Sequence, residues 1–321
     1  MYMHIPSSQP ITNYNFINYL TRNIISQWGY RGDPIFPCPQ PVSIERKDFD
    51  KLKQHEYFVA VKNDGIRYVM FFTTDKHDRK LCILCDRNMK FSTIKVTVDD
   101  NLYHNTLFDG ELIEENGSFK FVIYDAVCLC GNHIGKNPFE SRLAEIDYCV
   151  TTLIKPFENT ISIETKPFYK KSDFNTFLEQ QYNVESKIDG IIFMPNKIPV
   201  LTGTQFSMFK WKTNHTVDFL IKQNGEDLEA YVYNKNELTK FANVKHDTDE
   251  GKIFIEKFYS LNPNMEETCI LECLFVKEKQ NFTPLLIRTD KNYPNSLRTV
   301  ERTLYNADEN VILDEFIELF K

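Results

Sequence analysis

Two stretches of the chain share an uncommon beginning. One is "VKNDGIRYV" (residues 61–69) and the other is "SKIDGIIFM" (residues 186–194). In both, Lys-x-Asp-Gly comes before a run of strand-forming residues. Asp-Gly between apolar alternating runs is typical of a tight turn between two strands, and a third Asp-Gly, in "LFDGELI" (residues 107–113), has no such lysine. The turn alone therefore does not show whether Lys62 or Lys187 has a chemical role.

The composition is that of a globular protein with a β-rich core. The chain has 321 residues, 42% hydrophobic and 26% charged, which is ordinary for folded domains and long enough for two of them. Phe (26) and Tyr (16) outnumber Gly (11), which favours strands. The net charge of −7 argues against a broad nucleic-acid surface, because such surfaces are basic. A nucleic-acid substrate would therefore be contacted over a short length by a local cluster of cations.

Neither a membrane span nor a secretory signal is expected. No window approaches the roughly 20 apolar residues that cross a bilayer, and residues 1–10 lack a basic segment followed by an apolar core. We therefore expect a soluble, intracellular protein in a reducing compartment. Cys82 and Cys85 form a CxxC and Cys128 and Cys130 a CxC, both in strand-like apolar runs. Zinc is an alternative, but we expect buried free thiols.

The pattern along the chain predicts two regions. The first has helices at 15–28, 43–56 (with Ser43 as N-cap), 138–154 and 171–182, and strands from Tyr57 onward. In the second, strands are expected at 217–223, 228–235, 252–260, 267–276 and 282–290. Five strands in under 100 residues indicate a small barrel such as an OB-fold. Residues 311–321 read as an acidic amphipathic helix that packs back on a domain.

Several charged residues lie inside apolar strand or turn contexts. Each alone is explained by a solvated strand end, although alternation places Lys210 and Lys212, which flank Trp211, on one face. Together they form a set of cations with a few carboxylates. Neither GxxxxGK[ST] nor GxGxxG occurs, so P-loop and dinucleotide-binding interpretations fail.

Cations combined with carboxylates suit the chemistry of a nucleoside triphosphate. Breaking its α–β bond places charge on the leaving pyrophosphate, which lysine, arginine and a divalent metal stabilise. A lysine can also be the attacking group once it is a neutral amine. A neighbouring cation or desolvation lowers the pKa of a lysine and so favours that form.

Six blocks of residues carry a resemblance to a known family. "KNDGIR" (residues 62–67) resembles KxDGxR, the nucleotidyl-lysine motif of mRNA guanylyltransferases and ATP-dependent polynucleotide ligases. The other blocks follow in the family's order: "FDGEL" (108–112), "FVIYDAV" (121–127), "DGIIF" (189–193), "FKWKTNHTVDF" (209–219) and "RTDKNYPN" (288–295). The last two have the capping form, and residues 41–49 and the C-terminal stretch resemble the compact enzymes of chlorella-type large DNA viruses.

The resemblance implies an α+β fold and an activity. Residues 1–213 would form a nucleotidyltransferase domain of the adenylation or ligase type, with antiparallel sheets and flanking helices, and helix 311–321 would pack on it. Residues 214–310 would form an OB-fold β-barrel. Lys62 would attack the α-phosphate of GTP, expel pyrophosphate and pass GMP to the diphosphate end of an RNA, with Mg²⁺ or Mn²⁺ as cofactor. An RNA triphosphatase and a cap methyltransferase would be separate partner proteins, and no membrane is involved.

The resemblance also implies roles for individual residues. Arg67 and Glu111 would contact the ribose, and Asp189 with Glu111 would hold the metal. Tyr124 and Ile192 would cover the two faces of guanine. Lys170, or Lys171 in a shifted register, would read its O6. The phosphates would be bound by Arg87, Lys210, Lys212, Arg288 and Lys291, and Asp218 and Asp290 would orient pyrophosphate when the second domain closes.

Arg67 is the residue that separates the two lysines. It lies two positions after the glycine of the first stretch, as a cation that favours the neutral amine and grips the nucleotide. In the second stretch Asp189 is the informative residue, and Lys187 is expected to be an ordinary solvated lysine. Two alternatives stay open: an ATP-dependent RNA or DNA ligase of the same superfamily, and a nucleic-acid-binding OB-fold module without catalysis.

Overall fold

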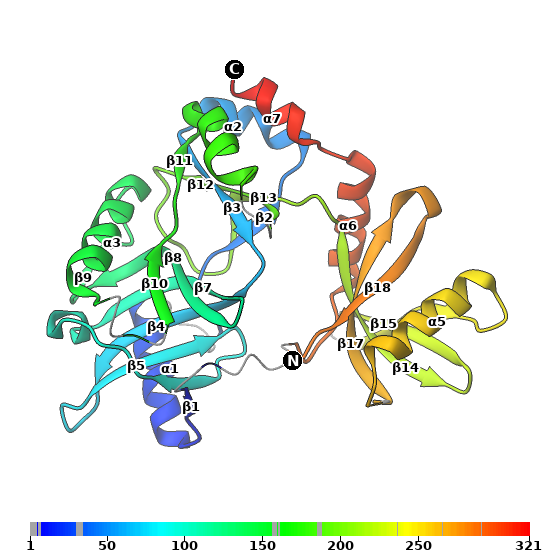
Figure 1. The fold of residues 1–321 in the computed structure, drawn as a ribbon, viewed down its shortest axis with the longest axis horizontal. Coiled ribbons are helices and arrows are strands. Elements are labelled where there is room, and N and C mark those ends of the chain that lie inside the picture. Colours follow the sequence, from blue (N-terminus) through cyan, green and yellow to red (C-terminus); the bar gives the residue numbers. More distant parts are fainter. Residues whose placement is uncertain are drawn as a thin grey trace. The chain divides into compact units, whose positions relative to one another are not determined.

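A computed structural model describes residues 5, 8–29, 35–155, 159, 161–184, 188–235, 237–264, 266–289 and 291–321. The chain divides into two compact units (Figure 1). The larger unit contains the described residues up to Trp211 together with Asp314–Lys321, and the smaller unit is Lys212–Leu313. The chain therefore passes between the units twice, after Trp211 and after Leu313.

Two sheets form the larger unit. The first is eight-stranded, in the order β1-β6-β5-β4-β7-β8-β10 with β9 beside β8. Its strands are β1 (Gln9–Pro10), β4 (Ile66–Thr74), β5 (Lys80–Asp86), β6 (Phe91–Ile94), β7 (Thr106–Glu115), β8 (Ser118–Leu129), β9 (Asn132–His133) and β10 (Ile161–Thr165). The second is five-stranded, in the order β11-β3-β12-β13-β2. Its strands are β2 (Gln40–Ser43), β3 (Tyr57–Asn63), β11 (Tyr169–Lys170), β12 (Ile188–Pro195) and β13 (Thr204–Trp211).

Helices cover both sheets of the larger unit. They are α1 (Tyr14–Gln27), α2 (Phe49–Gln54), α3 (Phe139–Leu153), α4 (Phe174–Phe177) and α7 (Leu313–Leu319). Leu20 and Ile24 of α1 are fully buried against Val69 and Phe71 of the first sheet. On the second sheet, Phe316 of α7 is fully buried, and its ring centroid lies 5.0 Å from that of Phe193 on β12.

The opening stretch does not form the hairpin that its Asp-Gly indicates. Strands β3 and β4 belong to different sheets, since β3 pairs with β11 and β12 while β4 pairs with β5 and β7. Asp64-Gly65 carries the chain from one sheet to the other. A Cβ on Gly65 would lie only 2.6 Å from the Leu112 carbonyl oxygen and 2.8 Å from Glu111 Cγ. The glycine is therefore needed for close packing of the two sheets.

The other two Asp-Gly pairs lie inside strands. The 189–190 pair falls within β12 at a register shift, opposite the end of β3, so the two opening stretches pair with each other. The 109–110 pair falls within β7, also at a register shift. Asn116-Gly117, with φ of 52° and 78°, does make the tight hairpin between β7 and β8. The hairpin interpretation of Asp-Gly was therefore wrong at all three positions.

The expected helix at 43–56 begins later than its sequence pattern indicates. Ser43 ends strand β2, and a short 3-10 turn (Arg46–Asp48) leads into α2. The cap is Glu45, whose side chain and that of Asp48 form a reciprocal capping box. The expected N-cap, Ser43, was therefore wrong, since the capping residue Glu45 lies two positions later.

The smaller unit is built on one five-stranded sheet in the order β16-β15-β14-β17-β18. The strands are β14 (Thr216–Asn224), β15 (Asp227–Asn234), β16 (Glu237–Val244), β17 (Thr268–Val276) and β18 (Asn281–Ile287), with helices α5 (Asp249–Leu261) and α6 (Leu297–Glu309). In the part of this unit that the structure describes, no pairing joins β16 to β18, so a closed barrel is not formed.

One expected strand of the smaller unit is a helix. Residues 252–260 lie in α5, whose buried side chains Phe254, Ile255 and Phe258 follow the helical spacing. Thr248 caps it by accepting a hydrogen bond from the Gly251 amide. The strand that the sequence analysis missed is β16, where the alternation is weak because five of its eight residues are exposed.

The cysteines are free thiols. Cys82, Cys85 and Cys128 are buried in strands, and Cys130 is half-buried. Burial raises the pKa of Cys128, as expected of inert structural thiols. Separately, within the described residues, the helices are all too short or too polar to cross a membrane.

Candidate functional site

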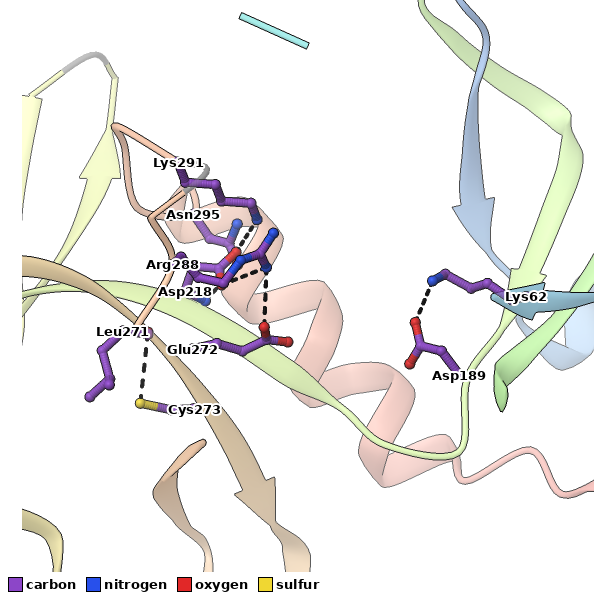
Figure 2. Close-up of polar contacts among 9 residues, drawn as sticks. All are labelled: Lys62, Asp189, Asp218, Leu271, Glu272, Cys273, Arg288, Lys291 and Asn295. Atoms are coloured by element: carbon purple, nitrogen blue, oxygen red, sulfur yellow. Dashed lines mark hydrogen bonds and ion pairs between the residues drawn. The ribbon is translucent and has the colours of Figure 1, made fainter. Parts of the chain in front are cut away.

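Pairing of the two opening stretches sets Lys62 beside Asp189 (Figure 2). Gly190 of β12 lies directly opposite Lys62 of β3, and the irregularity in β12 turns the Asp189 carboxylate toward the Lys62 amine, with which it forms an ion pair. Each of the two side chains remains 22% exposed. A ligand can therefore reach the amine and the carboxylate together.

The face of the second sheet that carries Lys62 also carries two other predicted site residues. Ile192 lies opposite both Ala60 on β3 and Lys210 on β13. Directly opposed residues point to the same face, and so do residues two apart along a strand. Lys62, Ile192 and Lys210 are therefore on one face of this sheet. Lys210 and Ile192 are both half-buried.

Arg67 is buried and fully engaged within the protein. Its Nε and Nη2 donate to the two carboxylate oxygens of Asp109 at 2.9 and 2.6 Å, and Nη1 donates to the Pro39 carbonyl at 2.8 Å. Burial disfavours the guanidinium charge, but Asp109 outweighs this and raises the pKa of Arg67. The pair has no net charge. Arg67 is therefore not the uncompensated cation beside Lys62 that the sequence analysis expected.

Tyr124 lies against the same arginine. Its ring centroid is 5.4 Å from Arg67 Cζ, a cation–π distance. Burial is the main reason why the pKa of Tyr124 lies well above its usual value, so the hydroxyl stays protonated. We call Arg67, Asp109 and Tyr124 together the wall of the first sheet.

Glu111 lies on the first sheet next to this wall. It lies opposite Arg67 on β4 and Val122 on β8. Burial raises the pKa of its carboxyl group, and the nearby charges of Lys166 and Lys62 only partly offset this. Among the described residues, its carboxylate has no hydrogen-bond partner. A partly buried, unpartnered carboxylate beside two lysines is suited to bind a hydroxyl or a metal ion.

A cavity of about 140 Å³ lies next to Glu111. Val122, the cross-strand partner of Glu111, lines it together with Ile113 and Lys120, which oppose each other further along β7 and β8. Lys166 lines it as well, is only 4% exposed, and donates a hydrogen bond to Asn63 Oδ1. A buried ammonium group in a cavity is suited to bind a ligand with hydrogen-bond acceptors.

The two lysines predicted to read the base lie elsewhere. Lys170 is exposed and forms an ion pair with Glu140 at 2.8 Å. Lys171 donates to the carbonyl groups of Leu52, Lys53 and His55. Neither lines the cavity beside Glu111. Of the two lysines that do line it, Lys120 and Lys166, only Lys166 is buried, and it is four residues before Lys170.

Arg87 lies on the turn after β5 and is exposed over much of its surface. The pKa of its guanidinium is nevertheless lowered, by loss of hydration around the head group and by the like charge of Arg67. Lys212, the last predicted phosphate ligand near β13, belongs to the smaller unit and is half-buried.

The smaller unit gathers a second cluster of charges (Figure 2). Asp218 on β14 is buried and pairs with Lys291 and, at 3.4 Å, with Arg288. Arg288 also contacts Glu272 on β17 at 3.1 Å, directly opposite Asp218 across the strands. The Asn295 side chain accepts a hydrogen bond from the Asp218 amide at 2.9 Å. Asp290 lies outside the described residues.

Four residues of these clusters were not assigned a role from the sequence. Asp109 belongs to "FDGEL", but a role was assigned only to Glu111 of that block. Glu272 stands between apolar residues in "CILECLF", a signal that could have been followed. Lys166 is followed by proline in "ETKPF", and the base-reading role was assigned to Lys170 or Lys171 instead. Asn63 lies between Lys62 and Asp64, and no sequence pattern distinguishes it.

Comparisons of this sequence with known proteins agree on one protein family. Residues 9–214 match the model for the mRNA capping enzyme, catalytic domain. The chain is 26% identical to the mRNA-capping enzyme subunit alpha of Schizosaccharomyces pombe, over 88% of this chain and 79% of that protein. It is 27% and 29% identical to the mRNA-capping enzymes of Caenorhabditis elegans and Danio rerio, over 88% and 91% of this chain. It spans about half the length of those two proteins, 49% and 51%.

Solved structures with a similar course of the chain are DNA ligases. A mycobacterial DNA ligase D complexed with ATP has a TM-score of 0.45 at 13% identity, covering 82% of this chain and 98% of that one. The chlorella virus DNA ligase-adenylate has a TM-score of 0.39 at 12% identity, covering 79% and 100%.

Proposed function

This chain belongs to the mRNA capping enzyme family and is a guanylyltransferase, and we propose that Lys62 is its nucleophile. The observation that carries this proposal is the pairing of β3 with β12, which sets Lys62 against Asp189 beside Glu111. Lys187, the lysine of the second Lys-x-Asp-Gly, lies outside the described residues and has no proposed role.

The reaction proceeds in two displacements at the same phosphorus atom. The neutral Lys62 amine attacks the α-phosphate of GTP, an N–P bond forms, the bond between the α-phosphorus and the bridging oxygen breaks, and pyrophosphate leaves with that oxygen. The nitrogen loses a proton in this step. A terminal oxygen of the RNA 5′-diphosphate then attacks the same phosphorus, the N–P bond breaks, and the amine regains a proton. The product is GpppN at the RNA end.

The guanine is bound between the two sheets of the larger unit. Tyr124 presents a ring face from the first sheet, and Ile192 lies on the Lys62 face of the second. Glu111, between Lys166 and the Lys62 ammonium, is placed for the ribose. We infer that Lys166, rather than Lys170 or Lys171, reads guanine O6, because its buried ammonium group lines the adjacent cavity and guanine offers acceptors at O6 and N7.

Asp189 and Glu111 fit a divalent metal ion. Both offer carboxylate oxygens, the ligands that Mg²⁺ and Mn²⁺ prefer, and Glu111 has no described partner. When bound, the ion neutralises phosphate oxygens. Asp189 forms an ion pair with Lys62 in this structure, so a metal ion that took the Asp189 carboxylate would release the lysine side chain toward the phosphate.

The smaller unit is proposed to be an OB-fold that binds the β- and γ-phosphates. Its strand order, with β14 between β15 and β17 and helix α5 before β17, is that of the five-stranded Greek-key barrel. Lys212, Arg288 and Lys291 supply the cations, and Asp218 positions Arg288 and Lys291. Asp290 keeps its role as a prediction, and Arg87 is proposed as a further triphosphate ligand from the larger unit.

Domain boundaries and partners also follow as proposals. We keep the transferase domain at residues 1–213 with helix 311–321, and the OB-fold at 214–310. An RNA triphosphatase and a cap methyltransferase stay proposed as partners of this chain. The resemblance of residues 41–49 to enzymes of large DNA viruses supports a viral origin.

Covalent labelling tests the proposed nucleophile. The protein is incubated with Mg²⁺ and α-labelled GTP or ATP, and the adduct is located by mass spectrometry. We expect GMP on Lys62, no adduct for Lys62→Ala with its unfolding midpoint unchanged, and full labelling of the matched variant Lys187→Ala.

Two results would contradict this assignment. Labelling by ATP alone would favour the ligase alternative. GMP found on Lys62→Ala would place the nucleophile elsewhere.

A further inference from the structure

The cavity beside Glu111 contains two polar atoms that the fold leaves unsatisfied. Thr165 Oγ1 and Gln181 Oε1 are buried and, among the described residues, lack a hydrogen-bond partner. Both residues line the cavity together with Lys166. Buried polar atoms are nearly always paired, and an unpaired one is destabilising. Two such atoms in one cavity indicate a place where a ligand supplies the missing partners.

The elements around the cavity explain why these atoms meet there. Thr165 ends β10, and Lys166 follows it directly. Gln181 lies on a short helical segment, Leu178–Tyr182. Its neighbour Gln180 is exposed and accepts a hydrogen bond from the Tyr169 hydroxyl. Of two adjacent glutamines, Gln180 is therefore exposed and has a partner, whereas Gln181 lines the cavity and has a buried side-chain oxygen that lacks a partner among the described residues.

The size of the cavity fits one ring of a base. An apolar cavity of about 150 Å³ accepts benzene, and this one measures about 140 Å³ and is lined by both polar and apolar residues. Water satisfies polar atoms of this kind in a free protein. A ligand that displaces the water must bring hydrogen-bond donors for the Gln181 oxygen and acceptors for the Lys166 amine.

We propose that Gln181, with Thr165, reads the donor edge of guanine and is a specificity-determining residue of this enzyme. The inference rests on the proposed function. The six-membered ring of guanine carries O6 as an acceptor beside N1–H and the exocyclic 2-amino group as donors. Lys166 meets O6, and the Gln181 oxygen accepts from the donor side. Adenine has an amino donor where guanine has the O6 acceptor, and an N1 acceptor where guanine has an N1–H donor, so the groups that Lys166 and Gln181 would meet are exchanged.

The alternative acceptor in the cavity is Glu164. Its carboxylate also lines the cavity, but the residue is exposed. Solvent can satisfy an exposed carboxylate whichever base is bound, so Glu164 contributes little to the choice between bases. Solvent cannot reach the buried Gln181 oxygen, so the wrong base would leave it without a hydrogen bond. This makes Gln181 better suited than Glu164 to discriminate between bases.

Nucleotide analogues test this proposal in the full-length protein. Inosine triphosphate keeps O6 and N1–H but lacks the 2-amino group. The rate of adduct formation, as kcat/KM, is measured with GTP, ITP and ATP for the wild type, Gln181→Leu, Glu164→Gln and the matched control Gln180→Leu. We expect Gln181→Leu to lose about tenfold or more with GTP and much less with ITP, so that the GTP-to-ITP ratio collapses. Gln180→Leu keeps the wild-type ratio.

Folding and base reading are separated by a second measurement. Because the Gln181 oxygen has no described partner, Gln181→Leu should leave the unfolding midpoint unchanged or slightly raised. A wild-type GTP-to-ITP ratio in Gln181→Leu would overturn this inference alone, as would a loss of the ratio in Glu164→Gln only. A wild-type protein that forms no adduct would overturn the proposed function and this inference with it.

Discussion

The buried ion pair between Arg67 and Asp109 forms part of the wall of the first sheet, next to which Glu111 lies. The side chains are 7% and 3% exposed, and two parallel hydrogen bonds join them. Such a pair adds little net stability, because desolvation opposes the attraction, but removing one partner is costly. Arg67 therefore has a structural role in addition to its place in the nucleotidyl-lysine motif.

Asp109→Asn should be strongly destabilising because it leaves the Arg67 guanidinium buried without a counter-charge. We expect a loss of about 3–5 kcal/mol in the free energy of unfolding, measured by denaturant titration, and reduced GMP labelling. Glu114→Gln on the same strand is the control, since Glu114 is exposed, and it should change neither quantity. A stable Asp109→Asn variant with normal labelling would show that the ion pair is dispensable.

Lys166 shows where residue-level sequence reasoning stops. The proposed nucleophile, Lys62, was predicted from its motif, because the chemistry restricts both residue types and spacing. The base-reading lysine was sought by position alone, and three lysines within six residues, Lys166, Lys170 and Lys171, cannot be ranked that way. Burial distinguishes them, since Lys166 is 4% exposed while Lys170 is on the surface. Burial depends on the parallel pairing of β10 with β8, a contact between distant segments.

The Asp-Gly elements show the same limit for strands. Sequence patterns located β3, β4, β7 and β12 well, because their alternation and β-branched content are local properties. They could not show that one Asp-Gly crosses between sheets while two others are irregularities within strands. Residues 252–260 were mistaken for a strand for a related reason, since their short apolar runs fit both periods and only burial of Phe254, Ile255 and Phe258 decides.

Gly65 should be required for the passage between the sheets. Gly65→Ala would force a Cβ to within 2.6 Å of the Leu112 carbonyl oxygen and 2.8 Å of Glu111 Cγ. We expect a destabilisation of about 1–3 kcal/mol and a loss of GMP labelling larger than the unfolded fraction explains, because Glu111 is displaced.

The matched control is the glycine of the true hairpin. Gly117 has open space around it and a φ of 78°, which asparagine tolerates. Gly117→Asn should therefore keep labelling normal at little cost in stability. Equal labelling in Gly65→Ala and the wild type would show that the close packing at Glu111 has no part in the reaction.

At the scale of the whole molecule, the net charge of −7 limits how RNA is held. Cations in both clusters are paired with carboxylates: Lys62 with Asp189 in the larger unit, and Arg288 with Asp218 and Glu272 in the smaller unit. An enzyme of this kind gains little from counterion release along an RNA chain. It is expected to recognise the diphosphate end and only a few nucleotides, whereas a binding module without catalysis would follow the strand.

Salt dependence separates these two modes. Preformed lysyl-GMP enzyme is mixed with 5′-diphosphate RNA, and the RNA concentration for half-maximal transfer is measured at 50 and 200 mM salt. With one or two phosphates neutralised and a slope near −0.7 per phosphate, affinity should fall only about three- to sevenfold. Six or more contacts would cost more than about a hundredfold. Lengthening the RNA at constant salt is the internal control and should leave the value unchanged, because the added nucleotides meet an acidic protein. A steep salt slope that grows with RNA length would instead require a continuous basic track on the surface.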